Sequence, residues 1–169
     1  DRAQVDHNTS SGSAGGMALY PGNLTMNGAS SVHHNQGGYA GGIEANTPTA
    51  TENRMTMNDT SSVYANIASD PAGVMGISMV GDLVMNDRSV VRSHVSATVK
   101  RAVEIYMYNG PATPSITMTG QSRIRDNVLA AGYGALTLYP NCNLQTSASG
   151  VNARVVGNTP VNIFTAPGC

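Results

Sequence analysis

The chain has 169 residues and a formal net charge of −1, and only 11% of its residues are charged. No apolar run is long enough to span a bilayer, so membrane insertion is not expected. Lys100 is the single lysine, and a chain this sparsely charged offers no broad basic surface, so nucleic acid is not an expected partner. Strong helix formers are scarce beside Gly, Asn, Ser and Thr, which favours an all-β fold.

A column of β-branched residues recurs along the chain, each followed three positions later by Asn or His. Its members are Val5, Val32, Val63, Val91, Ile124 and Val155. Successive members lie 27, 31, 28, 33 and 31 residues apart. A period of this length predicts a stacked repeat protein in which every repeat forms one turn of a solenoid.

In chain order the repeats divide a single domain, residues 1–169, into coils with a partial coil at each end. The expected segments are a half-coil at 1–14, coils at 15–40, 41–72, 73–101, 102–131 and 132–160, and a C-terminal half-coil at 161–169. The first strand of a coil often follows glycine, as in GGMAL from Gly15. The second contains phrases such as LTMN and MTMN, and the third contains the β-branched column. Three parallel strands per turn predict a right-handed parallel β-helix of about five coils.

The interior of this β-helix can be read from residues that share a strand face. Two positions before the β-branched column every residue is Ala or Ser, and the second strands carry Met26, Met57, Met85 and Met118. Residues two apart in a strand point to the same side, so these side chains are expected to fill the core. The flexible thioether suits gaps between coils of unequal length, so the methionines are interpreted as core and not as a cofactor site.

The polar residues that follow the column are expected to form a structural ladder where the chain turns after the third strand. The ladder positions are Asn8, Asn35, Asn66, His94, Asn127 and Asn158. Stacked amides can donate to and accept from one another along the axis, as in cross-β structures. His94 can substitute with one donor and one acceptor, so we expect it to have a structural role.

The two cysteines, Cys142 and Cys169, lie 27 positions apart, which is close to one coil. A disulfide between these neighbouring layers would stabilise the last coil by roughly 3 to 4 kcal/mol in the loop-entropy model. Such a bond indicates an oxidising compartment, so we expect an extracellular or cell-surface protein. Two unpaired thiols are the alternative.

The phrases GNLTMNGASSVHHN, NRMTMNDTSSVYANIA and SITMTGQSRIRDNVLA, each with an upstream glycine signal, resemble the repeats of polymorphic outer-membrane proteins. They are also similar to repeats in autotransporter-type adhesin passengers. The resemblance covers roughly residues 3 to 160 and implies a secreted or surface-displayed β-helix used for adhesion or assembly. It implies no catalytic residues. The chain departs from that family in showing neither a membrane barrel nor a leader, which leaves the mode of anchoring open.

An enzyme is the alternative from another functional class. Glu44 and Glu104 occupy equivalent outward places in first strands two coils apart, which separates them by about 10 Å and suits an inverting glycosidase pair. The intervening coil is expected to place Met75 there, and no nearby Asp completes a cluster. We therefore expect no enzymatic activity, with a polysaccharide lyase or hydrolase as the alternative.

Three further surface patterns suggest binding functions. His7 and His34, with His33 beside them, lie in adjacent coils, but they lack a complete ligand set, so no metal or other cofactor is expected. An arginine row on the outer side of the third strand, suited to an acidic glycan, comprises Arg88, Arg92, Arg123, Arg125 and Arg154. Asp87 and Asp126 lie between these arginines and would offset their charge, which favours a solvated surface without a ligand. An ice-binding rank of outward residues would comprise Thr25, Thr56, Val84, Thr117 and Gln145.

The chain begins at a third strand and ends at a segment, 161–164, that alternates like a first strand. Open β-helix ends expose unpaired backbone groups and apolar core, which favours pairing with another coil. We therefore expect a structural or adhesive module that stacks head to tail into a fibre or forms part of a longer surface protein. Its expected partners are copies of itself or a surface glycan or protein ligand.

Overall fold

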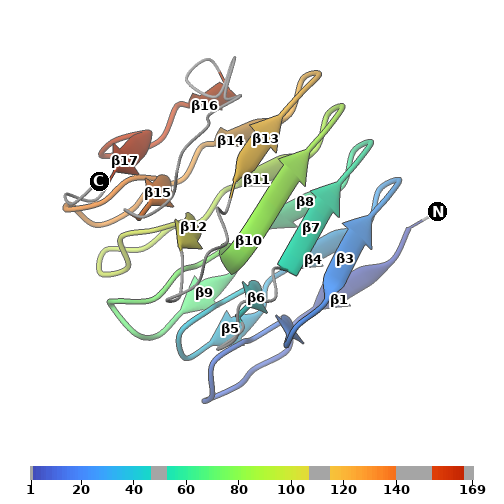
Figure 1. Cartoon of the computed structure of the whole chain (residues 1–169). Helices are drawn as coiled ribbons and strands as arrows, with labels where there is room; N and C mark the ends of the chain where they lie inside the picture. The colour runs from blue at the N-terminus through green and yellow to red at the C-terminus, as the bar shows by residue number, and fades with distance from the viewer. Residues whose placement is uncertain (1, 47–52, 107–114, 140–153, 166–169) are drawn as a thin grey trace.

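The computed structural model describes residues 2–46, 53–106, 115–139 and 154–165. Over these ranges the chain is all-β and winds as a solenoid of parallel strands, which confirms the expected fold class. In Figure 1 the second strands lie at the front and run upward, and each later coil lies further to the left, so the winding is right-handed. Within the described ranges, no helix has the length and apolar character needed to cross a membrane.

Three stacks of strands form the sides of the solenoid. The third strands make a six-stranded sheet from β1 (Gln4–Asp6), β4 (Ser31–His33), β8 (Ser62–Tyr64), β11 (Val90–Arg92), β14 (Arg123–Arg125) and β16 (Val155–Val156). The first strands are β2 (Met17–Leu19), β6 (Ile43–Ala45), the start of β10 (Ile77–Met85), β12 (Val103–Tyr106), β15 (Leu136–Leu138) and β17 (Ile163–Thr165). The second strands are β3 (Asn23–Met26), β7 (Asn53–Met57), the end of β10, and β13 (Ile116–Met118). Two short strands, β5 (Gln36–Gly37) and β9 (Ile67–Ala68), pair at a corner.

The described residues form about four complete turns, slightly fewer than the five expected. The fifth coil contributes β15 and β16. Its expected second strand, at Leu144–Thr146, lies outside the described residues.

The third coil has no loop between its first and second strands, because β10 runs without interruption through both. Its first half pairs with β6 and β12, and its second half pairs with β7 and β13. Gly81 lies where the first half of β10 passes into the second half. Its φ is 130°, and a Cβ there would lie only 2.0 Å from the carbonyl oxygen of Asn53. A backbone conformation with positive φ and no room for a side chain requires glycine.

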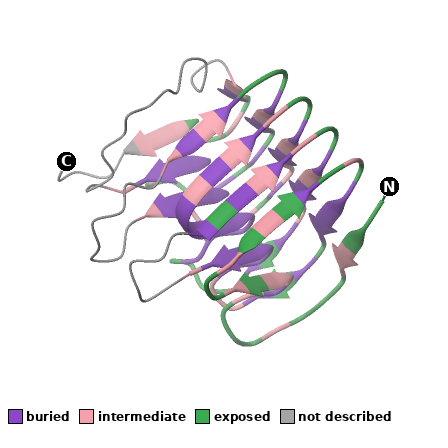
Figure 2. Ribbon diagram, turned by 45° about the vertical axis from the view of Figure 1, so that its right-hand side comes forward, coloured by how far each residue is buried: buried purple, intermediate pink, exposed green. Residues whose placement is uncertain are grey.

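The core is one continuous cluster of inward side chains, and the β-branched residues of the third strands form a column along its length. Val32 pairs with Val63, Val63 with Val91, and Val91 with Ile124, all in register. The central members are completely buried, and the methionines of the second strands pack against them in one cluster. Figure 2 shows these inward positions as buried segments along successive strands. Burying each large apolar side chain contributes about 1.5 to 3 kcal/mol, so this column is the main source of stability.

Tight turns at two corners use the left-handed backbone conformation. Between the second and third strands the left-handed residues are Gly28, Asp59, Asp87 and Gly120. After the third strand they are His7, His34, Ala65, Ser93, Asp126 and Gly157. Asn, Asp and Gly adopt this conformation most easily. Ala65 and Ser93 adopt it less easily, so we infer that the neighbouring coils hold the backbone of these two residues in the left-handed conformation.

Candidate functional site

The six expected ladder residues lie at the turn after the third strand, and hydrogen bonds join them in two runs. In the first run, Asn8 Nδ2 donates to Asn35 Oδ1 at 3.0 Å, and Asn35 Nδ2 donates to Asn66 Oδ1 at 3.1 Å. In the second, His94 Nδ1 lies 3.2 Å from Asn127 Oδ1, and Asn127 Nδ2 donates to Asn158 Oδ1 at 2.8 Å.

Backbone amides reinforce both runs. The amides of Asn8, Asn35, His94 and Asn127 donate to the same side-chain oxygens of the following coil. Among the described residues no hydrogen bond joins Asn66 to His94.

A second ladder runs along the corner between the second and third strands, and the sequence interpretation missed it. Asn58 Nδ2 donates to Asn27 Oδ1, and Asn86 Nδ2 donates to Asn58 Oδ1, both at 2.8 Å. The hydroxyl of Thr119 donates to Asn86 Oδ1 at 2.8 Å. The last letters of the phrases LTMN, MTMN, LVMN and ITMT are the signal that would have revealed this ladder.

The outer face of the first-strand sheet carries a buried polar cluster around the two expected carboxylates. Glu44 and Glu104 both pair with Ser78 of the intervening coil, so the expectation of Met75 at that place is wrong. The chain contains extra residues before β10, which shifts the strand start to Ile77. Both glutamates are almost completely buried, at 3% and 2% exposure.

Tyrosine and arginine side chains satisfy these carboxylates. The hydroxyls of Tyr20 and Tyr39 donate to Glu44 at 3.0 Å and to Glu104 at 2.8 Å respectively. Ser78 also donates to Glu104, and Arg101 Nε lies 3.4 Å from its other oxygen in a buried ion pair. Arg101 further donates to the Tyr139 hydroxyl at 2.6 Å. These contacts tie the corner residues of several coils to one carboxylate.

The same burial fixes the protonation of the tyrosines. Burial is the main cause, and the negative charge of Glu104 the second, that raises the pKa of Tyr39 and of Tyr106. The same two causes raise the pKa of Tyr139 to about 12. Burial and the hydrogen bond to Glu44 also raise the pKa of Tyr20. All four hydroxyls therefore remain protonated donors near neutral pH, which suits a structural network.

The three expected histidines meet on the outer side of the first coils. The rings of His7 and His34 stack at 5.2 Å with an interplanar angle of 9°, and Nδ1 of His33 lies 2.8 Å from Nδ1 of His34. Burial is the main reason that the pKa of His33 is lowered. In the described part of the chain, no three His, Cys, Asp or Glu side chains are arranged to hold a metal ion.

The arginine row lies on the outer face of the third-strand sheet. Arg92 pairs in register with Arg125, and Val90 pairs with Arg123 in the adjacent row. Arg154 directly precedes Val155, which pairs with Ile124. The structure therefore brings these side chains together over three neighbouring coils.

The expected threonine rank is also in register on the second-strand sheet. Thr25 pairs with Thr56, Thr56 with Val84, and Val84 with Thr117. Beside it runs the second ladder, which ends in Thr119. Gln145, and likewise the expected disulfide partners Cys142 and Cys169, lie outside the described residues.

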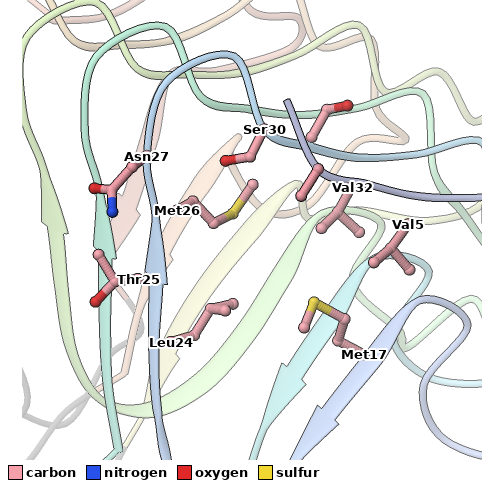
Figure 3. A pocket seen from close by; sticks show the side chains of 10 residues that line it. Val5, Met17, Leu24, Thr25, Met26, Asn27, Ser30 and Val32 are labelled. Carbon is pink, nitrogen blue, oxygen red and sulfur yellow. The ribbon is translucent and has the colours of Figure 1, made fainter. Parts of the chain in front are cut away.

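The N-terminal end of the solenoid contains an apolar hollow of about 290 Å³. Figure 3 shows Val5, Met17, Leu24 and Met26 pointing into it, whereas Thr25 points away. Val5, Met17 and Leu24 are only partly buried, although they belong to the core columns that are buried in the next coil. The hollow is therefore lined by inward side chains of the first coils.

Comparison with known proteins finds no matching family model, no matching curated protein and no matching solved structure.

Proposed function

We propose that this chain is an extracellular structural or adhesive β-helix module. The observation that supports this best is the uninterrupted core column, which stacks coil on coil and ends at its N-terminal side in an apolar hollow. Outside that column, the buried carboxylates of Glu44 and Glu104 accept hydrogen bonds from side chains of the protein itself. A scaffold that acts through its ends and faces, without catalysis, fits these features.

The likeness of the repeats to polymorphic outer-membrane proteins and autotransporter adhesins supports the same proposal. The likeness implies a location on or outside the cell, where a Cys142–Cys169 disulfide would form. Non-reducing mass spectrometry of the native protein tests the disulfide. A mass two hydrogens below that of the reduced chain supports the proposal, and two freely alkylated thiols contradict it.

In the proposed assembly, the N-terminal hollow receives the last coil of another copy. Because the contact joins different surfaces of the two copies, repetition produces a filament unless the rotation closes a ring. The same hollow would receive a preceding coil if the module lies within a longer polypeptide. In both cases the parallel pairing continues across the junction with the usual spacing of about 4.8 Å.

Light scattering and negative-stain electron microscopy test the assembly. We expect filaments with an axial repeat of about five rungs, each about 4.8 Å, and we expect Met17→Glu to abolish them by placing a carboxylate in the hollow. Val128→Glu is the matched control, because Val128 is exposed on a side face. A wild-type protein that stays monomeric at every concentration would contradict head-to-tail stacking.

Ice binding is a second candidate function, favoured by the in-register rank of Thr25, Thr56, Val84 and Thr117. The three threonines present hydroxyl and methyl groups, and Val84 presents methyl groups only, at the rung spacing along one sheet face. Thermal hysteresis in the wild type that disappears in Thr56→Tyr would support this function. An absence of hysteresis in the wild type would exclude it.

A further inference from the structure

The outer face of the third-strand sheet concentrates cationic side chains of a chain whose net charge is −1. Arg92 and Arg125 form one row along the solenoid axis, and Arg123 belongs to the adjacent row with Arg154 next to it along the axis. Arg88 lies exposed just before β11. Five of the nine lysine and arginine residues of the chain therefore lie on or beside one face.

The acidic residues expected to neutralise this face do so only in part. Asp126 forms an ion pair with Arg125. Asp87 instead accepts a hydrogen bond from the backbone amide of Asp59, at 3.0 Å. Among the described residues, Arg88, Arg92, Arg123 and Arg154 form no ion pair with a carboxylate.

Three of these guanidinium groups make one or two contacts each within the protein, and Arg92 donates to the hydroxyl of Ser93 at 3.3 Å. The Cζ atom of Arg92 lies 4.5 Å from the centre of the Tyr64 ring. Arg123 donates to the carbonyl oxygen of Ser122 at 2.9 Å, and Arg154 donates to that of Gly120. A guanidinium has five N–H donors, so most donors of each group remain for a ligand. Because the groups are already ordered, a ligand loses less conformational entropy on binding them.

We infer that this face binds a linear polysaccharide that carries carboxylate or sulfate groups. The inference rests on the proposed adhesive function and names its ligand class. Arginines lie on three consecutive rungs, spaced about 4.8 Å apart, with Arg92 on the first, Arg123 and Arg125 on the second and Arg154 on the third, so an extended anionic chain along the axis would meet positive charge on each rung. Guanidinium groups match the planar oxygen pairs of carboxylate and sulfate groups.

Single-stranded nucleic acid fits this face less well, although it is also anionic. Such binding relies on aromatic rings whose faces are free to stack with bases. The Tyr64 ring is covered on one side by His33, at 4.6 Å, and Arg92 packs over it as well. The ring is therefore not available as a platform for a base.

The experiment measures binding of the whole chain to size-defined heparin and polygalacturonate oligosaccharides, with dextran and a thymidine oligonucleotide as comparison probes. We expect binding to at least one anionic oligosaccharide, none to dextran, and weakening as salt rises. The two anionic probes distinguish sulfate from carboxylate recognition. No binding to either, or tighter binding to the oligonucleotide, would overturn the inference.

The variant Arg92→Gln/Arg123→Gln is expected to weaken binding roughly tenfold, since each exposed charge contact contributes modestly. The control Arg54→Gln/Lys100→Gln removes the same charge from other parts of the molecule and should retain binding. An equal loss in both variants would show non-specific attraction and contradict the proposed face. If circular dichroism shows that Arg92→Gln/Arg123→Gln is unfolded, Arg88→Gln/Arg154→Gln replaces it.

The size of each variant by light scattering separates this inference from the proposed stacking. The substituted arginines lie on a side face, so both double variants should assemble as the wild type does. Lost glycan binding with intact assembly supports the inference. Assembly without any wild-type glycan binding contradicts the inference and leaves the structural module in place.

Discussion

Two corners of the same solenoid carry side-chain ladders, but only one ladder is continuous. At the corner between the second and third strands, hydrogen bonds connect Asn27, Asn58, Asn86 and Thr119 without interruption. At the corner after the third strand, the ladder stops between Asn66 and His94. The comparison shows what a ladder position requires: a side chain that donates to one neighbour and accepts from the other.

The interruption extends to the backbone. Val128 donates its amide hydrogen to His94 O at 2.8 Å, and Ile67 donates to Asn35 O at 2.9 Å. By the same pattern Val95 would donate to Asn66 O, but no such bond occurs among the described residues. A hollow of about 180 Å³ lies at this step, lined by Ala65, Asn66, Ile67, Ser93 and Val95.

The imidazole explains the break. His94 Nδ1 contacts two oxygen acceptors, Arg92 O of its own coil at 2.9 Å and Asn127 Oδ1 of the following coil at 3.2 Å, so the neutral ring carries its hydrogen on Nδ1. His94 Nε2 is buried without a hydrogen-bond partner. Unlike an amide, the ring offers no oxygen at the place where Asn66 would donate.

The largest expected effect is on the first run of the interrupted ladder, from Asn8 to Asn66, at the corner after the third strand. Asn35→Ala removes the oxygen that accepts from Asn8 and the Nδ2 that donates to Asn66 and to Val5 O. Because Asn35 and its partner Asn66 are each 1% exposed, the polar groups left at this buried step stay away from water, and we expect a loss of about 3 kcal/mol in the free energy of unfolding. Urea denaturation measures it, and a loss below that of Asn58→Ala would contradict the account.

The next largest effect is the loss of stability at acidic pH that results from burial of His94. Burial lowers the pKa of His94 to about 3, so the unfolded chain takes up a proton below pH 6.5 whereas the folded chain does not. Stability from this residue is complete above about pH 6.5 and falls by about 1.4 kcal/mol per pH unit toward pH 3. His94→Asn removes this dependence.

Denaturation at pH 8 and pH 5 tests the His94 prediction. We expect the variant to lose about 2 kcal/mol less than the wild type between these two values. The carboxylates titrate in both proteins, so they cancel in the difference. Equal losses would show that His94 is not buried in its neutral form.

A smaller effect is expected at the continuous but more exposed ladder. Asn58→Ala breaks the hydrogen bonds to Asn27 and Asn86, yet water can replace them. We expect a loss of about 1 kcal/mol by urea denaturation. A larger loss than in Asn35→Ala would reverse the order of the two corners.

The smallest effect is local and requires no mutation. The Val95 amide, which lacks a hydrogen-bond acceptor in the described residues, should exchange with deuterium much faster than the Val128 amide. Amide exchange followed by NMR measures both. Equal protection would show that the backbone is paired across the step from Asn66 to His94.

The sequence was sufficient to predict the fold because identical side chains must face the core once in every turn. The column from Val5 to Val155 and the methionines of the second strands are found where they were expected. The length of each coil was predicted less well. Because the chain contains extra residues before β10, Ser78 lies between Glu44 and Glu104 at the place where Met75 was expected. Nothing in the local pattern predicts where an insertion is absorbed.

The candidate surfaces were predicted less completely than the fold. The arginines could be assigned to one face from their spacing, but their ion pairs depend on turn geometry, which directs Asp87 to the amide of Asp59. The tyrosine contacts with Glu44 and Glu104 join residues up to 65 positions apart, so no local pattern reveals them. These tyrosine contacts depend on the path that each loop takes over the outer face of the first-strand sheet.

Methyl contacts along the interior column test the central claim most directly. NMR of protein labelled at Val and Ile methyl groups should show nuclear Overhauser effects between Val32 and Val63, between Val63 and Val91, and between Val91 and Ile124. Val32 and Val91 are two rungs apart, roughly 10 Å, so their contact should be much weaker. Absence of the Val63–Val91 contact, or a strong direct contact between Val32 and Val91, would contradict the stacked solenoid.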